Sequence, residues 1–173
     1  MKNGRALQKR KAVKMSKERT LIIVKPDALN RDLAGEVISR FERKGLKIVA
    51  MKMEHLSIYK LKEHYAQHAE KEFFEELIRY MASIPSVLMV LEGKEACKVA
   101  RKLIGSTHGR EAEPGTLRGD YSVSNQMNLV HASETPEIAE KEIKNFFTEK
   151  EIFEYNKTNF DWIYARDAKG EIV

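Results

Sequence analysis

The sequence predicts one domain of the α/β or α+β class, in which helices pack on a β-sheet. Short apolar segments rich in β-branched residues alternate along the chain with segments whose apolar residues recur at helical spacing. The 173 residues are 42% hydrophobic and 33% charged, a globular composition with enough apolar side chains for one core. The spacing between the predicted strands leaves both a parallel and an antiparallel sheet open.

Four apolar segments are predicted to be strands. Residues 20–24 are apolar or β-branched, and Pro26 two positions later forces the chain to turn. Residues 46–53 alternate apolar side chains with lysines, with some irregularity, as in a strand that has one buried face. Residues 86–91 and 127–131 are short apolar segments that complete the set of predicted strands.

The segments between these strands carry helical patterns and end signals. Ser57 and Thr135 stand where helix N-caps are expected, because their hydroxyls can accept from the first free backbone N–H groups. Gly45 and Gly105 stand where helices end, because glycine tolerates the backbone conformation of a C-cap. The predicted helices comprise residues 31–44, 58–65, 73–81, 96–104 and 136–147.

Two segments have no clear period. Residues 106–120 contain three glycines and one proline, which predicts a long loop. Loops of that length in compact domains usually serve function. Residues 148–173 contain several aromatic side chains, and we expect an extension that packs on the body or on a neighbouring subunit.

The positive charge of the chain is concentrated at its N-terminus. The 31 basic and 26 acidic side chains give a net charge of +5. Residues 1–17 hold seven of the basic side chains and no acid, so the remainder, with 24 basic and 26 acidic side chains, is not a basic nucleic-acid-binding domain. We expect residues 1–17 to be a disordered tail; weak contact with nucleic acid or an anionic surface, and a transit peptide, are the alternatives.

Two features bear on location. Cys97 is the single cysteine, which excludes an intramolecular disulfide and fits a reducing compartment. The longest apolar runs, residues 21–24 and 87–91, are far shorter than the roughly 20 residues that span a bilayer. We therefore expect a cytoplasmic protein with no membrane-spanning helix and no secretory signal.

His131 is the main candidate for a nucleophile. It emerges from a predicted apolar strand, and neutral imidazole can attack phosphorus. Glu142 lies four residues after Ile138 and four before Phe146, so its carboxylate projects from the helix face that should be buried. A buried carboxylate needs a partner, and an imidazole N–H held by it would leave the other ring nitrogen as the attacking atom.

Lys25, Arg101 and Arg118 are candidate phosphate ligands. Lys25 directly follows the first strand, Arg101 lies on a predicted helix, and Arg118 lies in the long loop. If these cations converge, they can neutralise the charge of a polyphosphate, with Thr107 as a hydroxyl donor. The glycine-rich signatures of P-loop enzymes and protein kinases do not occur in the sequence, so the phosphates need another mode of binding.

The other histidines carry no comparable pattern. We interpret His55, His64 and His68 as solvent-facing side chains, and His108 as an incidental loop residue. None has carboxylates at a spacing that demands a metal ion.

Several motifs in register resemble those of the nucleoside diphosphate kinases. They lie at residues 18–27, 40–45, 64–65, 73–74, 114–120 and 128–133. The resemblance covers residues 18–147, and it implies a ferredoxin-like α+β sandwich, an antiparallel four-stranded sheet with helices packed on it. It also implies a ping-pong reaction, in which the γ-phosphate of a nucleoside triphosphate passes to a nucleoside diphosphate through a phosphohistidine.

The resemblance also implies residue roles. By motif position His131 is the nucleophile, and Glu142 and Ser133 orient it. Phe73 matches the aromatic side chain on which the base stacks, an interaction that tolerates any base. Mg²⁺ is the expected cofactor, held mainly by the nucleotide phosphates rather than by protein ligands. The residues expected around the phosphates and the sugar are Lys25, Tyr65, Arg101, Thr107, Arg118 and Asn128.

Two functional hypotheses follow from the sequence. The first is a Mg²⁺-dependent nucleoside diphosphate kinase with ATP as its main donor, assembled as a homo-oligomer, with a hexamer favoured over a tetramer. The alternative is a catalytically silent ferredoxin-like regulatory protein that binds nucleotides or nucleic acid. Acid-labile labelling of the protein by the γ-phosphate of ATP separates the two hypotheses.

Overall fold

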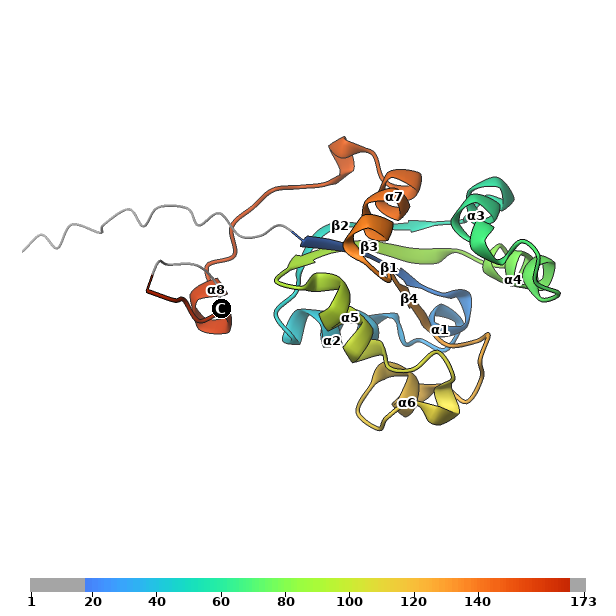
Figure 1. Cartoon of the computed structure of the whole chain (residues 1–173), viewed down its shortest axis with the longest axis horizontal. Coiled ribbons are helices and arrows are strands. Elements are labelled where there is room, and N and C mark those ends of the chain that lie inside the picture. The colour runs from blue at the N-terminus through green and yellow to red at the C-terminus, as the bar shows by residue number, and fades with distance from the viewer. Residues whose placement is uncertain (1–17, 169–173) are drawn as a thin grey trace, which may run out of the picture.

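A four-stranded antiparallel sheet forms the centre of the computed structural model, which describes residues 18–168 (Figure 1). Its strands are β1 (Glu18–Val24), β2 (Lys47–Glu54), β3 (Ser86–Gly93) and β4 (Val130–Ala132), in the order β2-β3-β1-β4. Both β3 and β4 pair with β1 antiparallel, and β2 pairs with β3 antiparallel. This settles the orientation that strand spacing left open and confirms the fold class. The irregularity expected in β2 is a register shift between Ile48 and Ala50.

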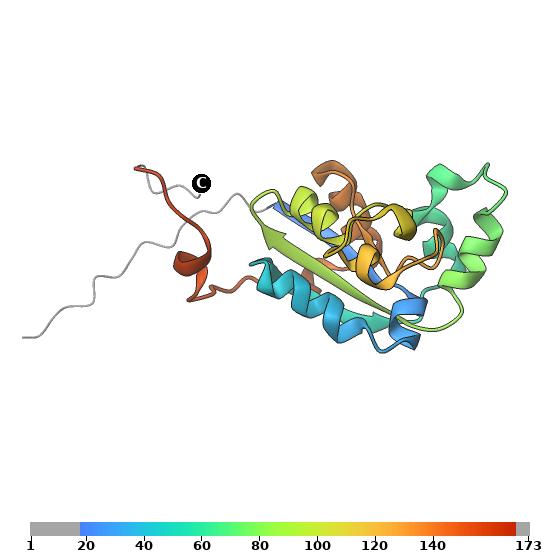
Figure 2. The ribbon, with the colours of Figure 1, turned by 90° about the horizontal axis from the view of Figure 1, so that it is seen from below.

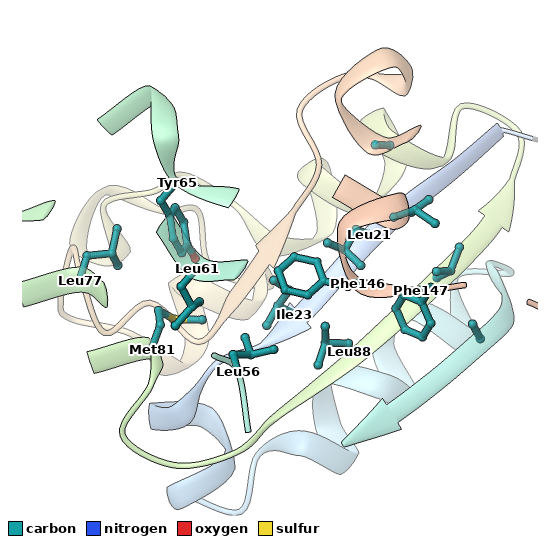
Figure 3. Close-up of a cluster of buried hydrophobic side chains, with 14 of the residues drawn as sticks. Leu21, Ile23, Leu56, Leu61, Tyr65, Leu77, Met81, Leu88, Phe146 and Phe147 are labelled. Carbon is teal, nitrogen blue, oxygen red and sulfur yellow. The ribbon is translucent and has the colours of Figure 1, made fainter. Parts of the chain in front are cut away.

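Helices cover both faces of the sheet and enclose two cores. Successive side chains along β1 alternate between these two cores. Leu21 and Ile23 face one buried cluster, whose close-up in Figure 3 shows Phe146 beside them. Ile22 and Val24 face the other cluster. The first cluster is supplied by α3 (Ile58–His64), α4 (Phe74–Met81) and α7 (Pro136–Phe146). The second is supplied by α1 (Pro26–Asn30), α2 (Ala34–Arg43), α5 (Ala96–Ile104) and α6 (Leu117–Tyr121).

The predicted helix caps are present. The hydroxyls of Ser57 and Thr135 accept from the backbone N–H groups of Lys60 and Ile138, at the starts of α3 and α7. At Pro26, where a turn was predicted, the short helix α1 begins. The fixed φ of proline suits the first helical position. The next helix, α2, therefore starts at Ala34 and not at residue 31.

The segment predicted as a loop over residues 106–120 contains regular structure. It holds the 3₁₀ turn η2 (Gly109–Glu111) and most of α6. Thr116 caps α6 by accepting from the N–H of Gly119. A helix of five residues is too short to show a helical period, which is why the sequence pattern did not reveal it.

The last strand differs from the predicted 127–131. Leu129 has a left-handed backbone with φ of 71°, so regular pairing begins only at Val130. The N–H of Leu129 donates to Oδ2 of Asp27 at 3.1 Å, and this side chain holds the turn where a strand bond would be expected. The strand thus carries His131 at its middle position.

The C-terminal segment leaves α7 and runs past β2 (Figures 1 and 2). It contains the 3₁₀ turn η3 (Glu149–Glu151) and the short helix α8 (Phe160–Ile163). The N–H of Phe153 donates to the carbonyl of Val49, and the hydroxyl of Tyr155 donates to that of Ile48. Trp162 in α8 is 91% exposed. The predicted basic tail, residues 1–17, lies outside the described residues, as do residues 169–173.

No helix within residues 18–168 has both the length and the apolar character needed to cross a membrane.

Candidate active site

His131 is held by a buried carboxylate across two elements. On β4 it pairs in register with Ile23 of β1, and α7 packs on β1 from the side that carries Glu142. The Nε2 atom of His131 lies 3.1 Å from Oε1 and 3.2 Å from Oε2 of Glu142. A carboxylate can only accept, so Nε2 carries the proton and Nδ1 keeps its lone pair. The geometry therefore leaves Nδ1 as the nucleophilic atom.

Ser133 locks this carboxylate in place. Its hydroxyl donates to Oε2 of Glu142 at 2.5 Å, and it accepts from the backbone N–H of Leu21 at 3.0 Å. Burial raises the pKa of Glu142, but the hydrogen bonds from His131 and Ser133 and the nearby imidazoles outweigh it, so the pKa lies below its usual range. The carboxylate is therefore anionic at neutral pH, as orienting a neutral imidazole requires.

Three cationic side chains contact the segment that carries His131. Arg118 on α6 donates from Nε to the carbonyl of Asn128 and from a terminal nitrogen to that of Val130, at 3.1 and 2.7 Å. Arg101 on α5 approaches the carbonyl of Ala132 at 3.5 Å. Lys25 donates from Nζ to Oδ1 of Asn128 at 2.7 Å. The residues that these side chains contact, Asn128, Val130 and Ala132, all lie within three positions of His131 along the chain.

The positive charges of the buried Lys25 and Arg118 oppose one another. Burial, and then the charge of Arg118, lower the pKa of Lys25 to about 8. Burial, and then the charge of Arg101, lower the pKa of Arg118 to about 10. An incoming anion would stabilise the charged forms of these two groups. The site is therefore suited to phosphate oxygens.

Asn128 ties the preceding loop to this cluster. Its Nδ2 donates to the carbonyls of Thr107 and Asn125, at 3.0 and 2.9 Å. Thr107 itself is exposed. Asn128 therefore links Lys25 to the backbone of the loops that follow α5 and α6.

Aromatic rings lead away from His131 toward solvent. Tyr65, directly after α3, is buried, and its hydroxyl has no hydrogen-bond partner in the described part of the chain. Burial raises the pKa of Tyr65. Its ring stacks with that of His68 at 6.4 Å, which in turn lies 5.8 Å from that of Phe73. Phe73 is 46% exposed, so one face is available to a flat ligand.

Sequence reasoning missed two contributors to this site. Asp27 supports the left-handed turn at Leu129 and is itself bonded by the hydroxyl of Tyr80. His64, interpreted from the sequence as solvent-facing, is buried beside His131. The signal for His64 was available, since it lies three residues after the buried Leu61 and so on the same face of α3.

One group of potential metal ligands occurs among the described residues. The nearest ligand atoms of His64, His131 and Glu142 lie within 4.8 Å of one another. Two imidazoles and one carboxylate are a donor set for transition metals, whereas Mg²⁺ prefers oxygen ligands. The cationic cluster instead fits phosphates, which can bring their own Mg²⁺.

Nucleotide binding is expected to weaken above pH 8 because of Lys25. Its pKa of about 8 means that the ammonium is charged below that pH and neutral above it. Since phosphate favours the charged form, affinity for ADP should fall above the pKa, by up to about tenfold per pH unit. Titration calorimetry of the wild type and Lys25→Gln checks this. The variant should bind more weakly and lack the fall; a variant that keeps the wild-type pH dependence would assign it to another group.

An antiparallel α+β sandwich with a carboxylate-held histidine among lysine and arginine side chains defines a phosphotransferase. Residues 18–152 match the family model described as nucleoside diphosphate kinase. A nucleoside diphosphate kinase of Archaeoglobus fulgidus is 53% identical over 147 residues, which cover 85% of this chain and 97% of that protein. One from Pyrococcus abyssi is 52% identical, covering 87% and 96%. The chain belongs to the nucleoside diphosphate kinase family.

Solved structures agree with this assignment. A nucleoside diphosphate kinase of Halobacterium salinarum in complex with CDP superposes with a TM-score of 0.84 at 39% identity, covering 86% of this chain and 99% of that one. A family member from Babesia bovis gives 0.82 at 41% identity, covering 85% and 99%. The chain is thus a kinase that acts on nucleoside di- and triphosphates, and such kinases generally need a divalent metal. The catalytically silent alternative is not favoured.

Proposed function

We propose that His131 carries the phosphoryl group between the two nucleotides. Nδ1 attacks the γ-phosphorus of a nucleoside triphosphate; the N–P bond forms as the bond to the β,γ-bridging oxygen breaks, and the diphosphate leaves with that electron pair. A terminal phosphate oxygen of the second diphosphate then attacks the same phosphorus, and the pair of the N–P bond returns to Nδ1. The observation that carries this proposal is the engagement of Nε2 by Glu142.

The surrounding residues stabilise charge and position the nucleotide. Glu142 accepts from Nε2 and so balances the positive charge that develops on the imidazole, and Ser133 holds Glu142. Lys25, Arg101 and Arg118 neutralise the phosphate oxygens. Tyr65, Thr107 and Asn128 supply neutral donors around the phosphates and sugar, and the exposed ring of Phe73 stacks on the base.

Mg²⁺ is the metal that we assign to the reaction. The support for this assignment is the set of charged side chains at the site. Glu142 is already engaged by His131 and Ser133, while the cationic side chains suit the phosphates that would carry the ion. When bound, Mg²⁺ shields the negative charge of the phosphate oxygens.

The setting of the enzyme is also part of the proposal. We assign residues 18–147 to the kinase domain, residues 1–17 to a basic tail, and residues 148–173 to an arm on the body or a neighbouring subunit. Weak contact of the tail with nucleic acid is the alternative to a tail without a binding role. The exposed Trp162 supports contact of this arm with another surface. We favour a cytoplasmic homo-oligomer, a hexamer rather than a tetramer, and native mass measurement tests that number.

The labelled intermediate tests the central proposal. Brief incubation with γ-³²P ATP is expected to label the protein, and mild acid should release the label because N–P bonds of phosphohistidine are acid-labile. After removal of ATP, GDP or CDP should collect the label as the triphosphate. Transfer between nucleotides without any labelled protein would contradict the covalent route.

A further inference from the structure

His64 is a buried imidazole next to His131. It ends α3 with 7% of its surface exposed, and within residues 18–168 neither Nδ1 nor Nε2 has a hydrogen-bond partner. Its ring lies 4.6 Å from that of His131, 4.5 Å from that of Tyr65 and 5.3 Å from that of Phe146, edge-on in each case. Burying unpaired polar atoms is costly, so packing alone would be served better by an apolar ring.

A carboxylate oxygen of Glu142 is the candidate hydrogen-bond acceptor for His64. Nδ1 of His64 lies 3.6 Å from Oε1 of Glu142, just beyond hydrogen-bond distance. The donors that hold this carboxylate are His131 and, on Oε2, Ser133. A small rotation of the His64 ring would bring a third donor onto Oε1.

We propose that His64 is a positioning residue, whose Nδ1–H donates to Oε1 of Glu142 and fixes the carboxylate that orients His131. This inference rests on the proposed phosphohistidine route and adds to it. His64 touches neither the nucleotide nor the phosphorus in this scheme. It acts through Glu142 by keeping the carboxylate plane, and hence the His131 ring, in one orientation.

A neutral His64 suits this role. Burial, followed by the charge of His131, lowers the pKa of His64 to about 3, so the ring is uncharged in the working range. A charged His64 would form its own ion pair with Glu142 and compete with His131. A neutral donor adds a hydrogen bond while leaving the negative charge of Glu142 to His131.

The titratable groups that act on this pair come from several elements. Lys25 follows β1 and disfavours charge on His64, as does His68. Besides burial, the charge of Glu142 also raises the pKa of Tyr65, which follows α3, and the pKa of Cys97 on α5. His131 on β4 completes the set. The thiol and phenol pKa values are both raised, so these two groups stay neutral at physiological pH.

Two substitutions at position 64 separate donation from packing. His64→Asn keeps an N–H near the place of Nδ1, whereas His64→Phe keeps an aromatic ring and removes the donor. The exposed His55, between β2 and α3, gives the matched control His55→Ala. Each variant is compared with wild type for thermal midpoint, ADP affinity, and the single-turnover rate of phosphoenzyme formation from pH 5 to 9.

His64→Phe is expected to slow phosphoenzyme formation roughly tenfold or more, the effect of losing a hydrogen bond to a charged group, with little change in ADP affinity. Losing the donor makes the carboxylate more basic, so the coupled pair of Glu142 and His131 keeps its proton to higher pH. The acidic limb of the rate profile should therefore move up by about one pH unit. His64→Asn should restore the rate and the limb to near wild type, and His55→Ala should change neither.

Each outcome bears on the proposal. A His64→Phe enzyme with the wild-type rate and limb would overturn it, and so would a His64→Asn enzyme as impaired as His64→Phe, whether through misfolding or slow chemistry. Two results would assign the nitrogens of His64 to a metal ion instead. One is equal rescue of the His64→Phe and His64→Asn variants by added Zn²⁺. The other is loss of the wild-type rate after EDTA treatment, even when Mg²⁺ is added back. Failure of the wild type to form acid-labile label would refute the phosphohistidine route itself, which distinguishes the two failures.

Discussion

Replacing His131 by alanine is expected to abolish phosphoenzyme formation and to reduce nucleotide kinase activity on the order of 10⁴-fold or more. The variant lacks the only atom in the scheme that bonds to phosphorus. The other imidazole near Glu142, that of His64, is buried, so it cannot take the place of Nδ1 of His131 as the attacking atom. The measurement is acid-labile ³²P in the protein together with steady-state transfer from ATP to GDP.

Binding provides the control for this loss. The cationic cluster of Lys25, Arg101 and Arg118 does not depend on the His131 side chain. It contacts backbone carbonyls of β4 and the side chain of Asn128, which precedes β4. ADP affinity of His131→Ala should therefore stay within a fewfold of wild type. Residual label at even a tenth of the wild-type level would show that another residue accepts the phosphoryl group.

Replacing Arg118 by alanine is expected to damage both stability and activity. Its guanidinium donates to three backbone carbonyls, those of Gly105, Asn128 and Val130, and so joins the loop after α5 to β4. Leaving buried carbonyls without donors should cost about 2–4 kcal/mol of unfolding free energy. Losing a positive charge from the phosphate site should lower kcat/KM by roughly 10²- to 10³-fold.

Two further variants separate these effects. Arg118→Lys keeps the charge but not the planar fork, so it should recover some activity with little of the stability. Arg110→Ala removes an exposed arginine from the same segment and should change unfolding free energy by less than about 0.5 kcal/mol. Denaturant unfolding gives the stability, and kinetics well below the thermal midpoint give the activity. An Arg118→Ala enzyme within threefold of wild type would remove Arg118 from the phosphate site.

Local patterns in the sequence account for most of the fold. The caps at Ser57 and Thr135 and the apolar spacing predicted α3 and α7, because those signals act over one or two helical turns. The α6 helix and the start of β4 were not predicted. A five-residue helix has too little period, and the turn at Leu129 depends on Asp27, about a hundred residues away in the chain.

The candidate site divides in the same way. The sequence by itself determined that Glu142 lies on the inner face of its helix, four residues before the buried Phe146. Ile138, the other apolar residue from which that face was predicted, is 37% exposed, and Ala139 and Ile143 complete the buried face instead. The sequence also determined, through several motifs in register, the family and its chemistry.

Only the tertiary structure decided where the cations gather and that a second imidazole lies beside the carboxylate. The strand order places β4 beside β1, which brings His131 close to the end of β1, where Lys25 follows. The helices α5 and α6 add Arg101 and Arg118 from elsewhere in the chain. It also decided that His64 is buried against Glu142. Such contacts join residues far apart in sequence, and no local period encodes the order in which strands and helices assemble.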